Sequence, residues 1–288
     1  MTCPAGYMPA EKAATCISTL EAWGYEVVVG KTLGSTSTNY FSADDLTRAQ
    51  ELQSMMNDKS VKAILFGRGG YGMGRIIDML HFKKFKKNPK WLIGFSDITV
   101  MHTHLLTNYN IASLHAPMAA AFNDGEQNST YILSLRDALK GEKAFYTCDT
   151  HKYNQDGKAK GILIGGNLAL LANVIGTVSD FETKNKILFI EDIGEYLYNI
   201  DRMLYQLKRI GKFKNIAGLV LGGFTDMKDT EKPFGKTMED ILKDITRTLN
   251  CPVCYNFPVS HGIENVALKI GVEYELLVSP GKIHLKEI

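Results

Sequence analysis

A serine, two acids and a histidine each follow a short apolar run in this sequence, and such side chains can carry out acyl transfer. The runs and the polar groups after them are Trp91–Ile93 before Ser96, Ile187–Ile190 before Glu191 and Asp192, and Pro252–Tyr255 before His261. In a serine hydrolase a histidine takes the hydroxyl proton, a carboxylate orients the imidazole, and the serine attacks a carbonyl carbon. Loops that follow the strands of α/β proteins gather into sites. The pattern therefore favours nucleophilic catalysis, although the order of the three residues alone decides nothing.

Ser96 lies at a predicted turn between a strand and a helix. Residues 91–93 are apolar, Gly94 marks a sharp turn, and residues 98–106 have a helical pattern. A serine at such a turn exposes its hydroxyl at the positive end of the helix dipole, and the N–H of Asp97 would point at an oxyanion. Ile98 stands where a G-x-S-x-G elbow has its second glycine, so the motif is incomplete. The alternative to a catalytic role is that Ser96 simply caps the helix.

A glycine-rich loop, Gly67–Arg75, follows a predicted strand at residues 61–66. Backbone N–H groups of such a loop can hold a phosphate, so a nucleotide-binding protein is one reading. The loop lacks the Gly-Lys-Ser/Thr of a Walker A motif and a following acid in register. A tight turn without ligand is a second reading. In a parallel sheet this loop would also lie beside Ser96, where its N–H groups complete an oxyanion hole.

The remaining groups of the predicted site come from the second half of the chain. Glu191 and Asp192 end a fully apolar run, where a carboxylate is either paired or functional. His261, beside Gly262 in an irregular loop, is the histidine best placed for catalysis. His115 also follows a strand and is read as a structural histidine.

Composition excludes several classes of protein. The 288 residues are 45% hydrophobic and carry a net charge of +2, which favours neither nucleic acid nor a membrane surface. No apolar run is long enough to span a bilayer, and without a basic-then-apolar leader we expect a cytoplasmic protein. Five cysteines fit a reducing compartment. Cys251 and Cys254 form a lone C-x-x-C, which we read as packing rather than a metal site, since a structural zinc needs a second pair.

Strands and helices alternate along the chain, which predicts an α/β protein with a parallel sheet and helices on both faces. We expect a strand at Tyr25–Val29 and a helix opened by Ser42 and Asp45 as a variant capping box. The polar residues 141–160 suggest a linker. The predicted organisation is therefore an N-terminal domain at 1–140 with the nucleophile, and a smaller C-terminal α/β domain at 161–288 with the acid and the histidine.

Five motifs together resemble a known family. They are Arg68-Gly69-Gly70-Tyr71-Gly72, Gly94-Phe95-Ser96-Asp97-Ile98-Thr99, Gly165-Gly166-Asn167-Leu168, Ile190-Glu191-Asp192-Ile193-Gly194-Glu195 and Ser260-His261-Gly262. In this order, over nearly the whole chain, they look like the motifs of the LD-carboxypeptidases. These are the muramoyl-tetrapeptide carboxypeptidase family of serine peptidases, which also contains the microcin-immunity proteins.

The resemblance implies a role for each matching residue. Ser96 corresponds to the nucleophile, Glu191 to the acid and His261 to the general base. The family's oxyanion donors fall on the N–H groups of Asp97 and of Gly70 in the Gly69–Gly70 turn. Residues expected to bind substrate are Arg68, Gly69, Tyr71 and Asn167, with Arg75 as a second cation for a terminal carboxylate. The resemblance also implies a site in a cleft between two domains, no metal or other cofactor, and a homodimer.

The expected activity is hydrolysis of the L,D bond before the terminal D-Ala of a cytoplasmic murein tetrapeptide, as in peptidoglycan recycling. The diamino acid before D-Ala stays open. Three alternatives remain: a related amidase that cleaves a peptidyl- or aminoacyl-nucleotide, as microcin-immunity proteins do; a nucleotide-binding oxidoreductase that uses the Gly67–Gly74 loop; and a non-catalytic binding module that keeps the fold.

Overall fold

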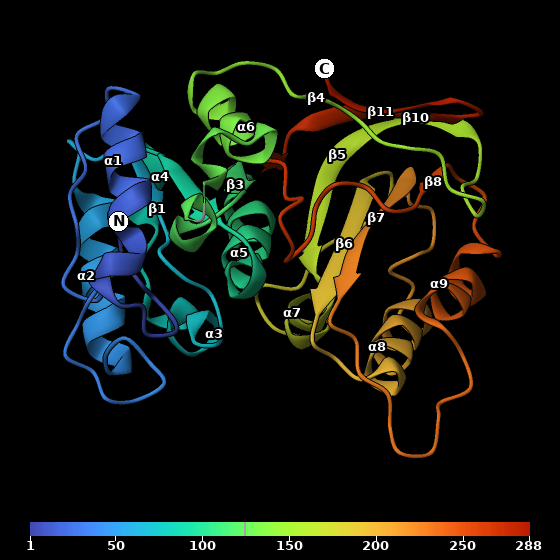
Figure 1. The fold of residues 1–288 in the computed structure, drawn as a ribbon, viewed down its shortest axis with the longest axis horizontal. Coiled ribbons are helices and arrows are strands. Elements are labelled where there is room, and N and C mark those ends of the chain that lie inside the picture. The colour runs from blue at the N-terminus through green and yellow to red at the C-terminus, as the bar shows by residue number, and fades with distance from the viewer. Residues whose placement is uncertain (124) are drawn as a thin grey trace. The chain divides into compact units, whose positions relative to one another are not determined.

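The computed structural model describes residues 1–123 and 125–288 and divides them into two compact units (Figure 1). The first unit holds Met1–Lys140 and Val266–Lys269, and the second holds Gly141–Asn265 and Ile270–Ile288. Each unit combines helices with one sheet, so the α/β class predicted from the sequence is confirmed. The two units are equal in length, so the second is not the smaller domain that we expected.

The first unit is built on a four-stranded sheet with the order β1-β2-β3-β9. Its strands are β1 (Ala63–Leu65), β2 (Trp91–Gly94), β3 (Ser113–His115) and β9 (Leu268–Ile270). β2 pairs in parallel with both β1 and β3. The helices are α1 (Ala14–Ala22), α2 (Asp45–Asn57), α3 (Met73–Ile76), α4 (Lys83–Lys87), α5 (Thr99–Tyr109) and α6 (Thr130–Leu139). Short 3-10 helices are η1 (Ala10–Ala13), η2 (Ile77–Met79), η3 (Ser96–Ile98), η4 (Ala119–Phe122) and η5 (Glu126–Asn128).

The start of α2 differs from the expected capping box. Asp44 is the cap, because its Oδ1 accepts a hydrogen bond from the N–H of Thr47 at 2.9 Å. The hydroxyl of Ser42 donates instead to the carbonyl of Cys3, so this buried serine ties the first loop to the segment before α2.

The strand expected at Tyr25–Val29 is absent from the structure, which assigns no regular element to those residues. Tyr25 N–H donates to the carbonyl of Leu20 at 3.1 Å, and the amino group of Met1 donates to the carbonyl of Val28. The carbonyl of Met1 accepts from the N–H of Gly30, just after this stretch, at 2.8 Å. Residues 24–28 form no strand and line a cavity of about 500 Å³ together with residues of β1. β-branched residues make a strand only where a neighbour supplies the hydrogen bonds, so propensity alone misled the prediction.

The second unit contains a seven-stranded mixed sheet with the order β4-β11-β10-β5-β6-β7-β8. The strands are β4 (Phe145–Thr147), β5 (Gly157–Asn167), β6 (Ile187–Ile193), β7 (Gly218–Thr225), β8 (Val253–Cys254), β10 (Glu273–Ser279) and β11 (Lys282–Glu287). β5 pairs antiparallel with β10 through its first half and parallel with β6 through its second half. The helices are α7 (Leu168–Asn173), α8 (Leu197–Arg209) and α9 (Met238–Thr246).

Residues 141–160 do not form a linker of their own. They contain β4 and the first residues of β5, both paired within the sheet of the second unit. The polar composition that suggested a linker reflects exposed strand faces, since Lys158 and Lys160 point outward and pair with Glu275. In antiparallel sheets one face is commonly solvated, so strand residues there are polar.

Each sheet buries a continuous apolar core. In the first unit, Ile93 of β2 and Leu114 of β3 belong to one cluster with Phe122 and Leu135. In the second unit, all residues from Ile187 to Asp192 are buried. Among the residues that the structure describes, no helix has the length and apolar character needed to cross a membrane.

Candidate active site

Ser96 occupies a strained turn between β2 and the helical segment η3–α5. The preceding Phe95 is extended, with φ −145° and ψ −170°, whereas Ser96 itself has φ 63°. A residue with a side chain rarely adopts positive φ, and such strain, on the order of 1–3 kcal/mol, clusters at functional sites. Gly94 permits the turn, because a Cβ there would lie 2.9 Å from Cγ1 of Ile98. Ile98 therefore packs over Gly94 in the position where a G-x-S-x-G motif has its second glycine.

A buried histidine braces the strand that carries Ser96. His102 of α5 has Nε2 2.8 Å from the carbonyl oxygen of Gly94 and Nδ1 2.8 Å from the hydroxyl of Ser113. The carbonyl can only accept, so Nε2 carries the proton and the Ser113 hydroxyl donates to Nδ1. Full burial lowers the pKa of His102 to about 4, which keeps the ring neutral. His102 was not predicted as a site residue from the sequence, where it stands within the helical pattern of residues 98–106.

The side chain of Asp97 joins Ser96 to the glycine-rich loop. Its Oδ2 accepts a hydrogen bond from the N–H of Met73, the first residue of α3, at 2.7 Å. The residue is 1% exposed, and burial raises the pKa of this carboxyl to about 6 against the opposing hydrogen bonds and the charge of Arg48. From the sequence we assigned only the backbone N–H of Asp97 a role, so the carboxylate is an additional anchor.

The glycine-rich loop passes directly beside Ser96. A Cβ on Gly69 would lie 3.2 Å from Cβ and 3.4 Å from Oγ of Ser96, so a larger residue would crowd the hydroxyl. Gly70 has φ 96°, a conformation that favours glycine. Arg68 is exposed and donates from Nη1 to the carbonyl of Tyr7 at 2.9 Å, and Tyr71 is half exposed beside Phe41. Arg68, Gly69, Gly70 and Tyr71 thus lie on this one loop, whereas Asp97 and Asn167 lie elsewhere.

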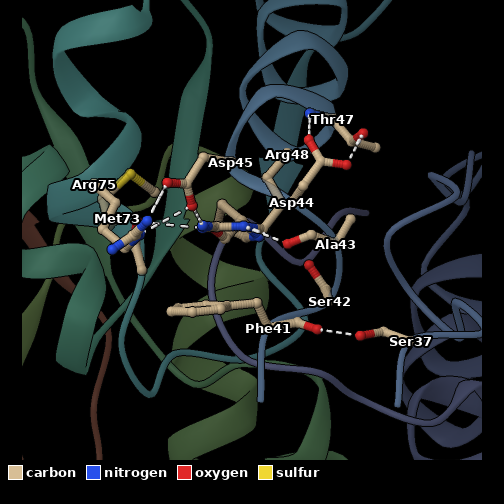
Figure 2. A network of polar contacts seen from close by, with 12 residues as sticks. Ser37, Phe41, Ser42, Ala43, Asp44, Asp45, Thr47, Arg48, Met73 and Arg75 are labelled. Carbon is tan, nitrogen blue, oxygen red and sulfur yellow. Dashed lines mark hydrogen bonds and ion pairs between the residues drawn. The ribbon is translucent and has the colours of Figure 1, made fainter. Parts of the chain in front are cut away.

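A network of arginines holds that loop in place (Figure 2). Arg48 is completely buried and donates to the carbonyls of Ala43 at 3.1 Å and Gly72 at 3.2 Å. Figure 2 shows the carboxylate of Asp45 joined to the guanidinium groups of both Arg48 and Arg75. The hydrogen bonds to Asp45 raise the pKa of Arg75. Asp45 engages Arg75 through three contacts of 2.6–3.0 Å, whereas the side chain of Arg68 is exposed.

The second unit brings Glu191 and His261 together. Glu191 lies in the buried part of β6, and its Oε2 lies 2.6 Å from Nδ1 of His261. A carboxylate only accepts hydrogen bonds, so the proton resides on Nδ1 and Nε2 is the basic nitrogen. This is the arrangement that a general base needs.

Two glycines let the histidine loop approach the sheet. A Cβ on Gly222 would lie 2.2 Å from the carbonyl oxygen of Val259, and one on Gly223 would lie 2.6 Å from Cβ of Ser260. The hydroxyl of Ser260 donates to the carbonyl of Glu264 at 2.8 Å and accepts from Gly262 N–H at 3.0 Å. The loop that presents His261 is therefore fixed at both ends. The Gly-Gly pair after an apolar strand was the signal that sequence analysis overlooked.

Asp192 organises the residues around Glu191. Its Oδ1 accepts from Nδ2 of Asn167 at 2.8 Å, and its Oδ2 accepts from the N–H of Ala169 at 3.0 Å. Burial raises the pKa of Asp192 to about 6, and the neighbouring charge of Glu191 adds to the rise. Oδ1 of Asn167 caps α7 through Leu170 N–H at 3.2 Å. Asn167, expected to bind substrate, thus has both ends of its amide engaged in holding this corner.

The predicted site residues are divided between the units. Ser96, Asp97 and the loop residues 68–71 belong to the first unit, whereas Asn167, Glu191 and His261 belong to the second. His115 is fully buried at the end of β3, beside the rings of Phe95 and His102. Within the part of the chain that the structure describes, no three His, Cys, Asp or Glu side chains gather as a metal site.

Comparison with known proteins identifies the family. Residues 1–116 match the LD-carboxypeptidase N-terminal domain and residues 160–276 the LD-carboxypeptidase C-terminal domain. The chain is 33% identical over 273 residues to a probable murein peptide carboxypeptidase of Bacillus subtilis, covering 94% of this chain and 85% of that one. It is 26% identical over 281 residues to the murein tetrapeptide carboxypeptidase of Pseudomonas aeruginosa, covering 93% and 89%.

Solved structures give the same result. The muramoyltetrapeptide carboxypeptidase of Oxalobacter formigenes superposes with a TM-score of 0.88 at 30% identity, covering 99% of this chain and 98% of that one. The microcin C7 self-immunity protein MccF, bound to adenosine monophosphate, superposes with a TM-score of 0.86 at 20% identity, covering 100% and 95%, a likeness of fold alone. With both domains matched and a relative a third identical over most of its length, this chain belongs to the LD-carboxypeptidase family.

Proposed function

We propose that this protein is a serine peptidase that hydrolyses the L,D bond before the terminal D-Ala of murein tetrapeptides. The observation that carries the proposal is the buried Glu191–His261 pair. Glu191 holds Nδ1 of the imidazole, so the basic Nε2 lies on the side of the ring away from the carboxylate. The second support is the positive φ of Ser96 at a strand-to-helix turn. Relatives named as murein peptide carboxypeptidases supply the substrate class.

The mechanism requires Nε2 of His261 to meet Oγ of Ser96 when substrate is bound. His261 takes the Ser96 proton as the hydroxyl attacks the carbonyl carbon of the L-centre. Glu191 holds the proton on Nδ1 and stabilises the imidazolium that forms. The N–H groups of Asp97 and Gly70 receive the oxyanion. His261 then protonates the leaving amino group of D-Ala, and water releases the acyl group from Ser96 in the reverse sequence.

Substrate recognition falls to the glycine-rich loop. The terminal carboxylate of D-Ala needs a cation, and Arg68 on this loop is exposed near Gly69, which contacts Ser96. Tyr71 offers a half-exposed ring on the same loop. We further propose that the substrates are cytoplasmic tetrapeptides of peptidoglycan recycling and that the protein acts as a homodimer, which sedimentation of the purified chain tests.

The decisive experiment measures D-alanine released from a purified murein tetrapeptide by mass spectrometry. The parent protein should release D-alanine, and Ser96→Ala should lose about 10⁴-fold or more of the rate. Ser279→Ala, at the half-buried last residue of β10, is the matched control and should keep full activity. A parent protein without D-alanine release, or a Ser96→Ala variant with unchanged rate, contradicts the proposal.

The alternative reactions are tested in the same assay. Release of an amino acid from an aminoacyl sulfamoyl adenylate, with the tetrapeptide left intact, would assign the protein to the amidase branch. Tight binding of NAD or ATP, lost when residues of the Gly67–Gly74 loop are changed, would instead support the nucleotide-binding reading. If the parent binds the murein tetrapeptide without hydrolysing it, and Ser96→Ala binds it equally well, the protein would be a non-catalytic binding module.

A further inference from the structure

Two cysteines that are 106 positions apart in the sequence lie in contact within the second unit. Sγ of Cys148 is 3.4 Å from Sγ of Cys254. Cys148 directly follows β4, and Cys254 ends β8, and these two strands form opposite edges of the seven-stranded sheet. Cys251 is near Cys254 in the sequence, but the sulfur in contact with Cys254 is that of Cys148.

The contact is held by the segment that we call the strap, residues 148–156, which connects β4 to β5 and lies against β8. Gln155 forms an antiparallel bridge with Val253, with N–H···O distances of 3.0 and 3.1 Å in the two directions. Oδ1 of Asn154 accepts the N–H of Tyr255 at 2.8 Å. The ring of His151 stacks on Tyr255 with centroids 5.1 Å apart. The strap is thus fixed to β8 and Tyr255 through residues that follow Cys148, and these contacts restrict how far the two sulfurs can separate.

We propose that Cys148 and Cys254 form a reversible disulfide, with a low-molecular-weight disulfide such as oxidised glutathione as the oxidant. The Cys148 thiolate attacks one sulfur of the oxidant, the S–S bond of the oxidant breaks, and one glutathione leaves as thiolate. Cys254 then gives up its proton and attacks Sγ of Cys148, which releases the second glutathione. Two protein thiols are oxidised, and one glutathione disulfide is reduced to two glutathione molecules.

The surroundings assign a separate role to each cysteine. Cys148 is half-buried and accessible to the oxidant, whereas Cys254 is fully buried. The hydrogen bond from the Cys254 thiol lowers the pKa of Cys148, and the same bond together with burial raises the pKa of Cys254. Cys148 is therefore the attacking thiolate and Cys254 the resolving thiol. Closing the gap from 3.4 Å to the roughly 2.0 Å of an S–S bond is a side-chain movement.

A disulfide here would join the strap covalently to the strand that leads to the His261 loop, since Cys254 is followed by Tyr255–Ser260. It would also close a long loop of chain, which restricts the unfolded state. The oxidised protein should consequently unfold at a higher temperature than the reduced protein.

The test incubates the full chain under native conditions with oxidised glutathione and then unfolds it in denaturant with N-ethylmaleimide, because Cys3 and Cys16 are buried. A digest of the alkylated protein is mapped by mass spectrometry. Alkylatable cysteines should fall from five to three, with one cross-linked peptide that contains Cys148 and Cys254 and disappears with reductant. Cys148→Ser should abolish the cross-link and the rise in unfolding temperature. Cys251→Ser, a half-buried neighbour, is the matched control and should retain both.

Three outcomes would overturn the proposal. They are five alkylated cysteines after oxidation, a glutathione adduct that stays on Cys148 without a cross-link, and a disulfide between Cys251 and Cys254. Because Cys254 is in the core, Cys148→Ser is the variant used, and its thermal unfolding in reductant should match that of the parent. None of these results depends on the peptidase activity.

Discussion

Asp97 and Asp192 occupy equivalent positions in the two units, each one residue after a group of the proposed triad. Asp97 follows Ser96 and accepts a backbone N–H where α3 begins, and Asp192 follows Glu191 and accepts one in the first turn of α7. In both cases the helix follows the neighbouring parallel strand. Each unit therefore fixes its reactive group against an adjacent helix by a buried carboxylate.

The first prediction concerns the pH dependence of stability. Burial raises the pKa of Asp97 to about 6, whereas an unfolded aspartate titrates near 3.9. Between these values the folded protein keeps a proton that the unfolded chain releases, so the free energy of unfolding falls as pH rises and levels off above about pH 6. Asp97→Asn should remove up to about 3 kcal/mol of this decline.

Urea unfolding of both proteins between about pH 4 and pH 7 measures the effect. Asp78→Asn, at an exposed site in the same unit, is the control and should keep the slope of the parent. If Asp97→Asn and the parent lose stability in parallel across this range, the raised pKa of Asp97 is refuted.

The second prediction concerns the tautomer of His261. In Glu191→Gln the amide can present its NH₂ group to Nδ1, which moves the proton to Nε2 and removes the base. We expect kcat to fall by about 10³–10⁴-fold with little change in KM. Glu195→Gln, in the same motif but half-exposed and hydrogen-bonded to Asn199, should leave kcat unchanged. Steady-state kinetics of D-alanine release provide the measurement, and equal losses in both variants would argue against an orienting role for Glu191.

The third prediction concerns the strain at Ser96. Glycine adopts positive φ without the steric cost that a side chain imposes, so Ser96→Gly should be more stable than Ser96→Ala by about 1 kcal/mol. Both variants lack the hydroxyl and should be inactive. Chemical denaturation of the pair isolates the backbone effect, because only the methyl group differs. Equal stability would mean that the φ of 63° carries no cost.

The fourth prediction separates two arginines of the glycine-rich loop. Arg68→Ala should raise KM about 10–100-fold, the effect of losing one charged hydrogen bond to the D-Ala carboxylate, with kcat nearly unchanged. Arg75→Ala should lower the unfolding temperature instead, because Asp45 loses one of its two arginine partners. A peptide amidated at its C-terminus serves as the control substrate, for which Arg68→Ala should make no difference. A larger KM effect from Arg75→Ala would reverse the assignment.

The sequence predicted local features of the site well. Gly94 and the apolar run before it indicated the turn at Ser96, and the same logic applied to the ends of β6 and β8 pointed to Glu191 and His261. These signals are short-range, because a buried strand and the turn after it are recorded in consecutive residues. The alternation of strands and helices likewise predicted the α/β class.

Long-range contacts were beyond reach of the sequence. Nothing adjacent to Cys254 in the sequence indicates that Cys148 lies against it. Arg75 and Asn167 have suitable side chains for substrate, but Asp45 and Asp192 already engage them. Tyr25–Val29 has strand composition without a strand beside it. In each case the outcome depends on a neighbour supplied by the tertiary fold.

The return of Val266–Lys269 to the first unit means that neither half is one uninterrupted stretch of chain. This short excursion begins where the bridge between Val259 and Asn265 closes the loop around His261, and it supplies β9 as an edge strand to the other sheet. A cut after Lys140 would therefore remove β9 from the four-stranded sheet of the first unit. The C-terminal fragment would keep the apolar residues of β9 without the strand that they pair with. To express the two units separately, residues Val266–Lys269 would have to be joined to the first fragment. The loop that carries His261 is thus connected directly along the backbone to a strand of the sheet that carries Ser96.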